Sequence, residues 1–153
     1  MTAVLQRIHK AEVYADGEFS GKADNGLFIL LGVAQNDEEN DALLLAEKIS
    51  KLRIFSDEND KMNLSVKDID GEVLIVSNFT LNANYSHGNR PEYLNAARPE
   101  RANYLYEYFV SLMRDRVRHV GTGVFGASMK INADLSGPVT IVMESDKLKK
   151  GTH

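Results

Sequence analysis

A chain of 153 residues is long enough for one domain around a single hydrophobic core. Its 43% hydrophobic and 26% charged residues are typical of a folded soluble protein, and a net charge of -4 argues against wrapping a nucleic-acid backbone. The chain has no cysteine, which excludes disulfides, thiolate metal sites and cysteine nucleophiles. No apolar run reaches the roughly 18 residues of a membrane span, and the start lacks a signal-peptide block. We therefore predict one domain over 1–153, located in the cytoplasm.

The first third of the chain is predicted to contain strands followed by a helix. Residues 1–33 have the alternation of a strand meander that ends in a buried strand over Leu27–Val33. Asn36 or Asp37 can then cap a helix that ends near Arg53. The apolar stripe of this helix comprises Ala42, Leu45, Ile49 and Leu52.

The middle of the chain combines a buried strand, a long loop and a second helix. The continuous apolar run Glu72–Val76 predicts a buried strand that leads into Ser77–Leu81. Residues 82–97 are polar and rich in asparagine, which makes them the longest loop. Pro99 suits the first turn of the second helix. The buried stripe of that helix comprises Ala102, Leu105, Tyr106, Phe109 and Met113.

The last third of the chain is predicted to be a strand that proline interrupts. Apolar residues alternate strictly from Phe125 to Leu135, Gly137-Pro138 breaks the run, and Val139 to Met143 resumes it. About six or seven strands, clustered at both ends of the chain, and two solid helices predict an α+β fold. We expect a mixed, largely antiparallel β-sheet system covered by two main helices.

Common cofactor and catalytic motifs are absent or lack their structural context. Gly121 to Gly126 matches GxGxxG, but a dinucleotide-binding turn must open a helix and the period of two that follows predicts a strand. These glycines are interpreted as turn or close-packing positions. The spacing of the four histidines matches no metal site, and they are His9, His87, His119 and His153. We predict no metal and no cofactor.

Two segments have local patterns that fit chemistry. Ser77-Asn78-Phe79-Thr80 follows a buried strand, so its backbone N–H groups can face a cleft as an oxyanion hole, or it is an ordinary strand end with Phe79 in the core. Ser136-Gly137-Pro138-Val139-Thr140 places proline inside a strand pattern, which indicates an edge, a bulge or a tight turn. Its Gly-Pro bond can also be cis.

Together these segments resemble the D-aminoacyl-tRNA deacylase family, whose signatures are Ser-Gln-Phe-Thr and Asn-x-Gly-Pro-Val-Thr. The resemblance covers nearly the whole chain, and further matching stretches are Leu5–Arg7, Arg53–Asp57, Lys61–Asn63, Gly88–Pro91 and Thr122–Met129. It implies the barrel-like fold of that family, and hydrolysis of the ester at the 3′ end of D-aminoacyl-tRNA as chiral proofreading in translation. Because glycine has no side chain to clash, glycyl-tRNA is a further expected substrate.

The resemblance also implies residue roles. Ser77, Asn78, Phe79 and Thr80 form the catalytic segment, with backbone N–H groups at Phe79 and Thr80 as the oxyanion hole. In a homodimer the partner subunit presents Gly137-Pro138 as a cis peptide whose carbonyls hold the substrate amine and exclude the L configuration. Three further residues line or brace the pocket, namely Arg7, Phe125 and Met129. The general base stays open between Thr80 and the terminal 2′-OH of the tRNA.

The chain departs from the family pattern at three positions. Asn78 replaces the usual Gln and keeps the amide, whereas Leu135 replaces an Asn and Glu92 stands where Ser is common. The last two bear on substrate range and tRNA contacts. Two other functions stay open: an esterase or peptidase for small D-amino-acid derivatives, and a binding module whose site has decayed.

Overall fold

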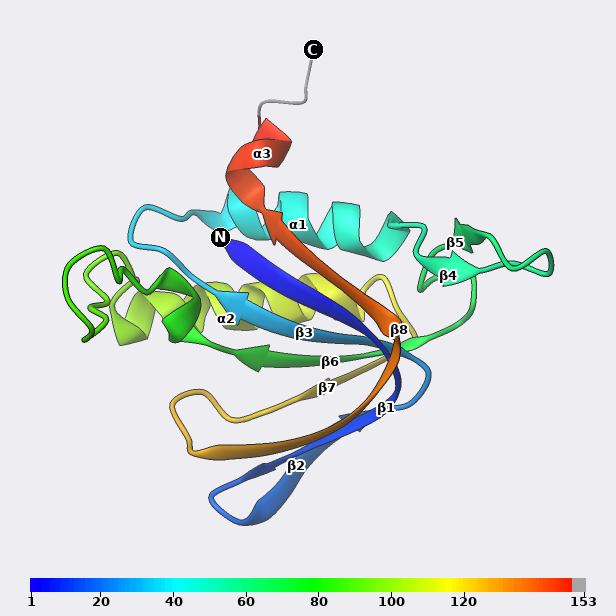
Figure 1. The fold of residues 1–153 in the computed structure, drawn as a ribbon, viewed down its shortest axis with the longest axis horizontal. Coiled ribbons are helices and arrows are strands. Elements are labelled where there is room, and N and C mark those ends of the chain that lie inside the picture. The colour runs from blue at the N-terminus through cyan, green and yellow to red at the C-terminus, as the bar shows by residue number, and fades with distance from the viewer. Residues whose placement is uncertain (150–153) are drawn as a thin grey trace.

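The computed structural model describes residues 1–149 (Figure 1), so His153 and the end of the predicted domain lie outside the described residues. Eight strands form in this part of the chain: β1 (Thr2–Ala15), β2 (Glu18–Ala23), β3 (Gly26–Gly32), β4 (Phe55–Ser56), β5 (Met62–Leu64), β6 (Glu72–Ser77), β7 (His119–Thr122) and β8 (Met129–Glu144). The helices are α1 (Glu39–Lys51), the 3-10 helix η1 (Phe79–Asn82), α2 (Pro99–Arg114) and the short α3 (Ser145–Lys149).

The main sheet is mixed, and β1 organises it. The strand order is β2-β1-β3-β6-β7, with β8 along the other edge of β1. Strands β2, β3 and β8 run antiparallel to β1, whereas β3–β6 and β6–β7 are parallel. The predicted α+β class is confirmed, but the predicted meander is wrong. The first half of the 14-residue β1 pairs with β3 and its second half with β2, so β3 keeps an edge for β6.

The sheet curls until β2 and β7 meet, which makes it a nearly closed barrel (Figure 1). The Ser20 hydroxyl donates to the carbonyl oxygen of Thr122 over 2.8 Å. A Cβ on Gly21 would lie 2.5 Å from that same oxygen, and one on Gly121 would lie 2.4 Å from the carbonyl oxygen of Lys22. Only glycine permits this approach, so Gly121 is the close-packing position that its sequence context predicts.

Two hydrophobic cores lie on the two faces of the curled sheet. Helices α1 and α2 cover one face, and the fully buried residues there include Leu5, Ile29, Leu45 and Phe109. The second core fills the inside of the curl with Ile8, Val13, Phe28 and Leu74. Each buried side chain of this size contributes roughly 1.5–3 kcal/mol. The two cores together hold the ends of β3 and β6 rigidly.

The helices agree with the predicted stripes, while their ends differ. In α1, Ala42, Leu45 and Ile49 are buried, and the helix stops at Lys51. Its N-cap is Glu38 rather than Asn36 or Asp37. Asp37 is buried instead, and its carboxylate accepts hydrogen bonds of 2.6 Å from the backbone nitrogens of Met1 and Ala34. The five predicted stripe residues of α2 are all buried.

Strand β8 also differs from its prediction, at its start and at the predicted break in its middle. It begins at Met129, because the residues from Gly123 to Ser128 form the turn from β7. It then continues through Gly137-Pro138, since β1 supplies partners on both sides and the register shifts only near Ile8. Among residues 1–149, even the 16-residue α2 falls short of the length and apolarity needed to cross a bilayer.

Candidate active site

Strand β6 carries the Ser77–Thr80 segment out of the core. The strand is buried from Glu72 to Val76 and ends at Ser77, after which η1 turns back over β3. The backbone nitrogen of Asn78 donates to the carbonyl oxygen of Leu31 over 2.8 Å. A Cβ on Gly32 would lie 2.9 Å from the Cβ of Leu81, so glycine at this position lets η1 pack directly on the sheet. The segment is thus held by the rigid end of a buried strand.

A cavity of about 530 Å3 opens beside this segment. It brings together five residues that the sequence singled out: Ser77, Asn78, Phe79, Phe125 and Met129. The remaining lining residues were not predicted as part of a site, and they are Tyr93, Ala96, Ala97, Pro99, Ala102, Gly126 and Ala127. Most of these are small, and no local pattern distinguishes a small residue at a cavity wall from one in a loop or helix.

The turn leaves one backbone donor open. The side-chain oxygen of Asn78 caps η1 and accepts from both the backbone nitrogen, at 3.3 Å, and the hydroxyl of Thr80. Within residues 1–149 the Phe79 N–H has no acceptor. The Phe79 ring is 58% exposed and meets the Tyr93 ring edge-on, with 5.0 Å between centroids. Phe79 is therefore not a core residue, and its N–H is available to a ligand.

The cavity contains almost no titratable chemistry of its own. Tyr93 is the one titratable side chain among the described residues that line it. Nearby, the Tyr106 hydroxyl donates to the carbonyl oxygen of Ile75 over 2.9 Å, and burial raises the pKa of this phenol. Its ring lies 6.3 Å from that of Phe125. Tyr106 was predicted only as a core residue, yet it braces both the end of β6 and a wall of the cavity.

Three of the predicted site residues lie away from this cavity, and they are Arg7, Gly137 and Pro138. Gly137-Pro138 is a cis peptide, as expected, and both residues are exposed. Arg7 donates from Nη1 to the carbonyl oxygen of Ile54 over 2.9 Å, and a Cβ on Gly137 would lie 3.3 Å from its Nη2. The buried Nε of Arg7 has no partner in the described part of the chain. Arg7 lines a separate hollow of about 220 Å3.

The strand register separates the two groups. Arg7 pairs with Leu27, whereas Ser77 pairs with Leu31, four residues further along β3. Four residues of a strand span roughly 13 Å. Within one chain, the Gly137-Pro138 segment therefore does not reach the cavity beside Ser77.

The long loop next to the cavity is held by Glu92. Its backbone exchanges two hydrogen bonds with Asn84, of 2.8 and 2.9 Å. Its carboxylate accepts from the backbone nitrogen of Leu94 over 2.8 Å and from the Asn84 amide over 2.7 Å. The Leu94 N–H, followed by the Asn84 amide, lowers the pKa of Glu92. Glu92 stands where the family resemblance implies Ser, and its hydrogen bonds hold the loop in shape.

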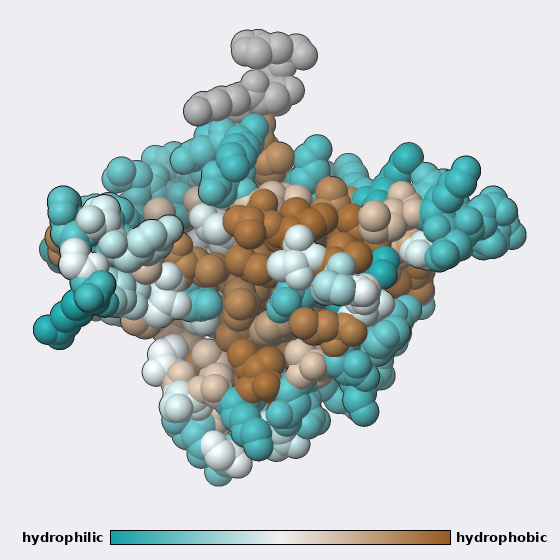
Figure 2. Space-filling model, in the orientation of Figure 1, coloured by the Kyte–Doolittle hydropathy of each residue, from teal (hydrophilic) through white to brown (hydrophobic). Residues whose placement is uncertain are grey.

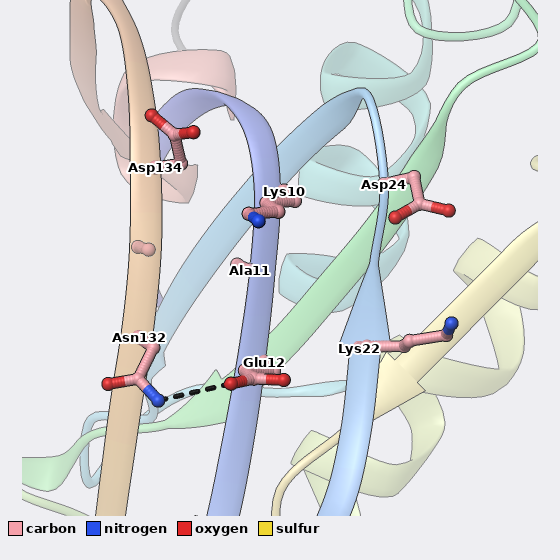
Figure 3. A pocket seen from close by; sticks show the side chains of 8 residues that line it. Lys10, Ala11, Glu12, Lys22, Asp24, Asn132 and Asp134 are labelled. Atoms are coloured by element: carbon pink, nitrogen blue, oxygen red, sulfur yellow. Dashed lines mark hydrogen bonds between the residues drawn. The ribbon is translucent and has the colours of Figure 1, made fainter.

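A second large hollow, of about 480 Å3, differs in character (Figure 3). Its walls carry charged side chains of both signs from β1, β2 and β8: in the strand register Lys10 lies opposite Asp134, and Glu12 lies opposite Lys22. The Asn132 amide donates to Glu12 over 3.1 Å. In residues 1–149 no group of three His, Asp or Glu side chains is arranged to hold a metal ion. The cavity beside Ser77 is therefore the better candidate for ester chemistry.

Comparison with known proteins agrees with the family resemblance of the sequence. A model of the D-Tyr-tRNA(Tyr) deacylase family matches residues 4–144. The chain belongs to this family. A D-aminoacyl-tRNA deacylase of Koribacter versatilis is 52% identical over 147 residues, with 96% of this chain and 99% of that protein covered. One of Caldicellulosiruptor saccharolyticus is 50% identical over 148 residues, covering 97% and 99%.

Solved structures share the deacylase fold. A protein described as a c-Myc DNA unwinding element binding protein superposes with a TM-score of 0.88 at 36% identity, covering 94% of this chain and 98% of that one. A probable eukaryotic D-amino acid tRNA deacylase superposes with a TM-score of 0.83 at 13% identity, covering 94% and 100%. The second likeness establishes the fold alone.

Proposed function

We propose that this protein hydrolyses the ester of D-aminoacyl-tRNA in the cavity beside Ser77, releasing the D-amino acid and the tRNA. Membership of the deacylase family gives the reaction and the tRNA substrate. One observation carries the assignment of the site: Phe79, whose backbone N–H is unpaired within residues 1–149, lines a cavity in which Tyr93 is the one titratable side chain among the described residues. Such a site can polarise a carbonyl but leaves the deprotonation of water to the substrate.

The Phe79 N–H is the proposed oxyanion donor. It lies at the first position of η1, where N–H groups have no partner within the helix. A single donor to a tetrahedral oxyanion contributes about 2.7–4 kcal/mol. The Thr80 N–H is a weaker candidate, because the Asn78 side chain already accepts its hydrogen bond.

Replacing Phe79 by proline tests this donor. Proline lacks the N–H and is tolerated at the first position of a helix after an extended residue, which Asn78 is. We expect Phe79→Pro to lower kcat by roughly 10²–10³-fold relative to Phe79→Ala, which loses the ring and keeps the N–H. Equal rates for the two variants would remove Phe79 from the oxyanion hole.

The terminal 2′-OH of the tRNA is the proposed activator of water. Thr80 is poorly placed as a nucleophile, since its hydroxyl donates to an amide oxygen rather than to a base and is not part of the cavity wall. A substrate ending in 2′-deoxyadenosine should react roughly 10²–10⁴-fold more slowly, while Thr80→Ala keeps most of the rate. A trapped acyl-Thr80 intermediate would contradict this assignment.

A second copy of the chain is proposed to supply the chirality filter. Gly137 and Pro138 are exposed on β8 and, by the register argument, lie too far from the cavity of their own chain. They are flanked by exposed apolar side chains, with Leu135 at 43% and Val142 at 60%. A two-fold pair that covers this surface can bring the Gly137-Pro138 carbonyls to the partner's cavity. There they can accept hydrogen bonds from the amine and obstruct an L side chain.

We propose that the chain acts as one domain over 1–153, in the cytoplasm where aminoacylated tRNA is used. The decisive assay compares D-Tyr-tRNA, L-Tyr-tRNA and D-tyrosine methyl ester as substrates. We expect cleavage of D-Tyr-tRNA only, at a rate at least about a hundredfold above the other two. Equal cleavage of the methyl ester would favour a general D-amino-acid esterase. Binding of D-Tyr-tRNA without cleavage would favour a non-catalytic module.

A further inference from the structure

We propose that the loop from Asn84 to Leu94 binds the unpaired nucleotides that precede the terminal adenosine of the tRNA, with Tyr85 stacking on a base. This proposal rests on the proposed function, because it assumes that the 3′ end of a tRNA enters the cavity beside Ser77. It assigns a binding role to a surface outside that cavity.

The first observation is that the loop has a defined shape. Beyond the Asn84–Glu92 pairing described above, the Asn84 side-chain oxygen accepts from the Ser86 backbone nitrogen over 3.1 Å and from its hydroxyl over 2.8 Å. At the base of the loop, the Asn82 amide donates to the carbonyl oxygen of Val33 over 3.1 Å. These hydrogen bonds fix the backbone that carries Tyr85, so little backbone ordering opposes binding.

The second observation is that the loop exposes large side chains beside the cavity. Tyr85 is 79% exposed and Leu94 is 81% exposed, the highest values among the large hydrophobic side chains of residues 1–149. Tyr93, which lines the cavity, adjoins Leu94 and also Glu92, the partner of Asn84. The backbone path from Tyr93 through this pair to Tyr85 spans no more than about 13 Å. In Figure 1 the segment projects beyond the end of β6.

An exposed ring on a rigid loop fits single-stranded nucleic acid. Aromatic side chains bind unpaired bases of any sequence through their faces, and a nearby cation interacts with the backbone phosphates. Arg90 supplies such a charge, as it is exposed at the tip of the loop. The rings of Phe79 and Tyr93 contact each other edge-on, whereas Tyr85 makes no aromatic contact within the described residues. Its face is available to a base.

Three substrates of increasing length test the proposal: D-tyrosyl-adenosine, D-tyrosyl-CCA and D-Tyr-tRNA. For Tyr85→Ala we expect KM to rise roughly 5- to 30-fold with the two longer substrates, the effect of losing one stacked base, and kcat to stay within about twofold. The adenosine ester should be cleaved as by the wild type. Tyr85→Phe, which keeps the ring, should restore the KM of the longer substrates.

The matched control is Phe19→Ala, which removes an aromatic ring 56% exposed on β2, away from the loop. It should change no KM. An equal KM increase for the adenosine ester would mean that Tyr85 acts through the cavity, and unchanged KM for every substrate would mean that it binds nothing. Either result overturns the proposal. A weakened dimer of Tyr85→Ala in sedimentation would also overturn it, by assigning the ring to a subunit contact.

Failure of the proposed function gives a different result. If the wild type cleaves none of the three esters, the reaction assignment falls, but the anisotropy of a labelled CCA trinucleotide still measures binding. Binding by the wild type that Tyr85→Ala weakens and Tyr85→Phe retains would support the nucleotide site without the reaction. Equal binding by all three proteins, or none, would overturn it.

Discussion

The two halves of β8 pair with the same strand, β1, but their outer faces differ in polarity. From Met129 to Leu135, β8 lies beside the second half of β1, where the Asn132 amide donates to Glu12 and Asp134 lies opposite Lys10 in the register (Figure 3). From Val139 to Glu144 it lies beside the first half of β1, where Val142 pairs with Val4. Val142 is 60% exposed, and Figure 2 shows the apolar surface gathered over this part of the sheet.

The difference indicates which surface is complete within one chain. The polar side chains of the first half are exposed to water, which solvates them, so this half needs no partner. An exposed apolar strand face is typical of a surface that another molecule covers. The boundary between the halves is the Gly137-Pro138 segment, which is the part proposed to enter the partner's cavity. Two predictions test this contrast, and two smaller ones test how α2 and β6 support the cavity and the sheet.

The largest effect is expected from a charge in the apolar half of β8, from Val139 to Glu144. Val142→Glu would bury an unpaired carboxylate in the proposed dimer interface, at a cost of several kcal/mol. Sedimentation should show a monomer, and deacylation of D-Tyr-tRNA should fall by at least roughly a hundredfold. Lys130→Glu, an exposed change on the first half of the same strand, should leave both unchanged. A dimeric and active Val142→Glu would show that this surface is free in solution.

Gly137→Ala should have the next largest effect, on activity more than on folding. Gly137 has a φ of 122°, and an added Cβ would lie 2.7 Å from the backbone nitrogen of Val139, so the segment must shift. We expect D-Tyr-tRNA cleavage to fall roughly tenfold or more, since about 1 Å of displacement at such a site is costly. Gly17→Ala, in a turn with a φ of 85° and open space around it, is the matched strain control and should remain active.

A smaller effect is expected from Tyr106→Phe. The variant loses one of two donors to the Ile75 carbonyl oxygen, since the Gly123 N–H still donates over 3.3 Å, so the free energy of unfolding should fall by about 0.5–1.5 kcal/mol. Because the same ring braces Phe125, kcat should fall only a few-fold while D over L selectivity is retained. Chemical denaturation and single-turnover assays measure the two quantities. An unchanged unfolding free energy would show that the Gly123 N–H alone satisfies the Ile75 carbonyl oxygen.

The smallest effect is a pH dependence at Glu72, the first residue of β6. The Asp24 backbone N–H, followed by charge from His119 and Arg118, lowers the pKa of Glu72 below its usual 4.5. A carboxyl whose pKa is depressed in the folded state stabilises the fold above the unfolded pKa and loses this contribution as the pH falls through the folded value. The free energy of unfolding should therefore decline below pH 4.5, and less steeply in Glu72→Gln. Parallel curves for both proteins would contradict it.

Local patterns in the sequence were sufficient for several elements and for the key segments. The apolar run Glu72–Val76, the stripe of α2 from Ala102 to Met113 and the start at Pro99 all depend on neighbouring residues, and all were correctly predicted. The motifs around Ser77 and Gly137 also identify the family without any structure. These patterns depend on residues that are close in the sequence, so they predict strands, turns and helices.

Tertiary structure decided how these parts meet. Strand β3 pairs with β1 because β1 is long enough to serve two neighbours on one edge, which strand periodicity does not contain. Tyr93 and Ala102 reach the cavity because the loop and α2 fold back beside β6, whereas Arg7 stays roughly 13 Å away along the strands. Sequence thus determined which segments are special, while their separation or contact depends on long-range strand register and packing, which no local pattern specifies.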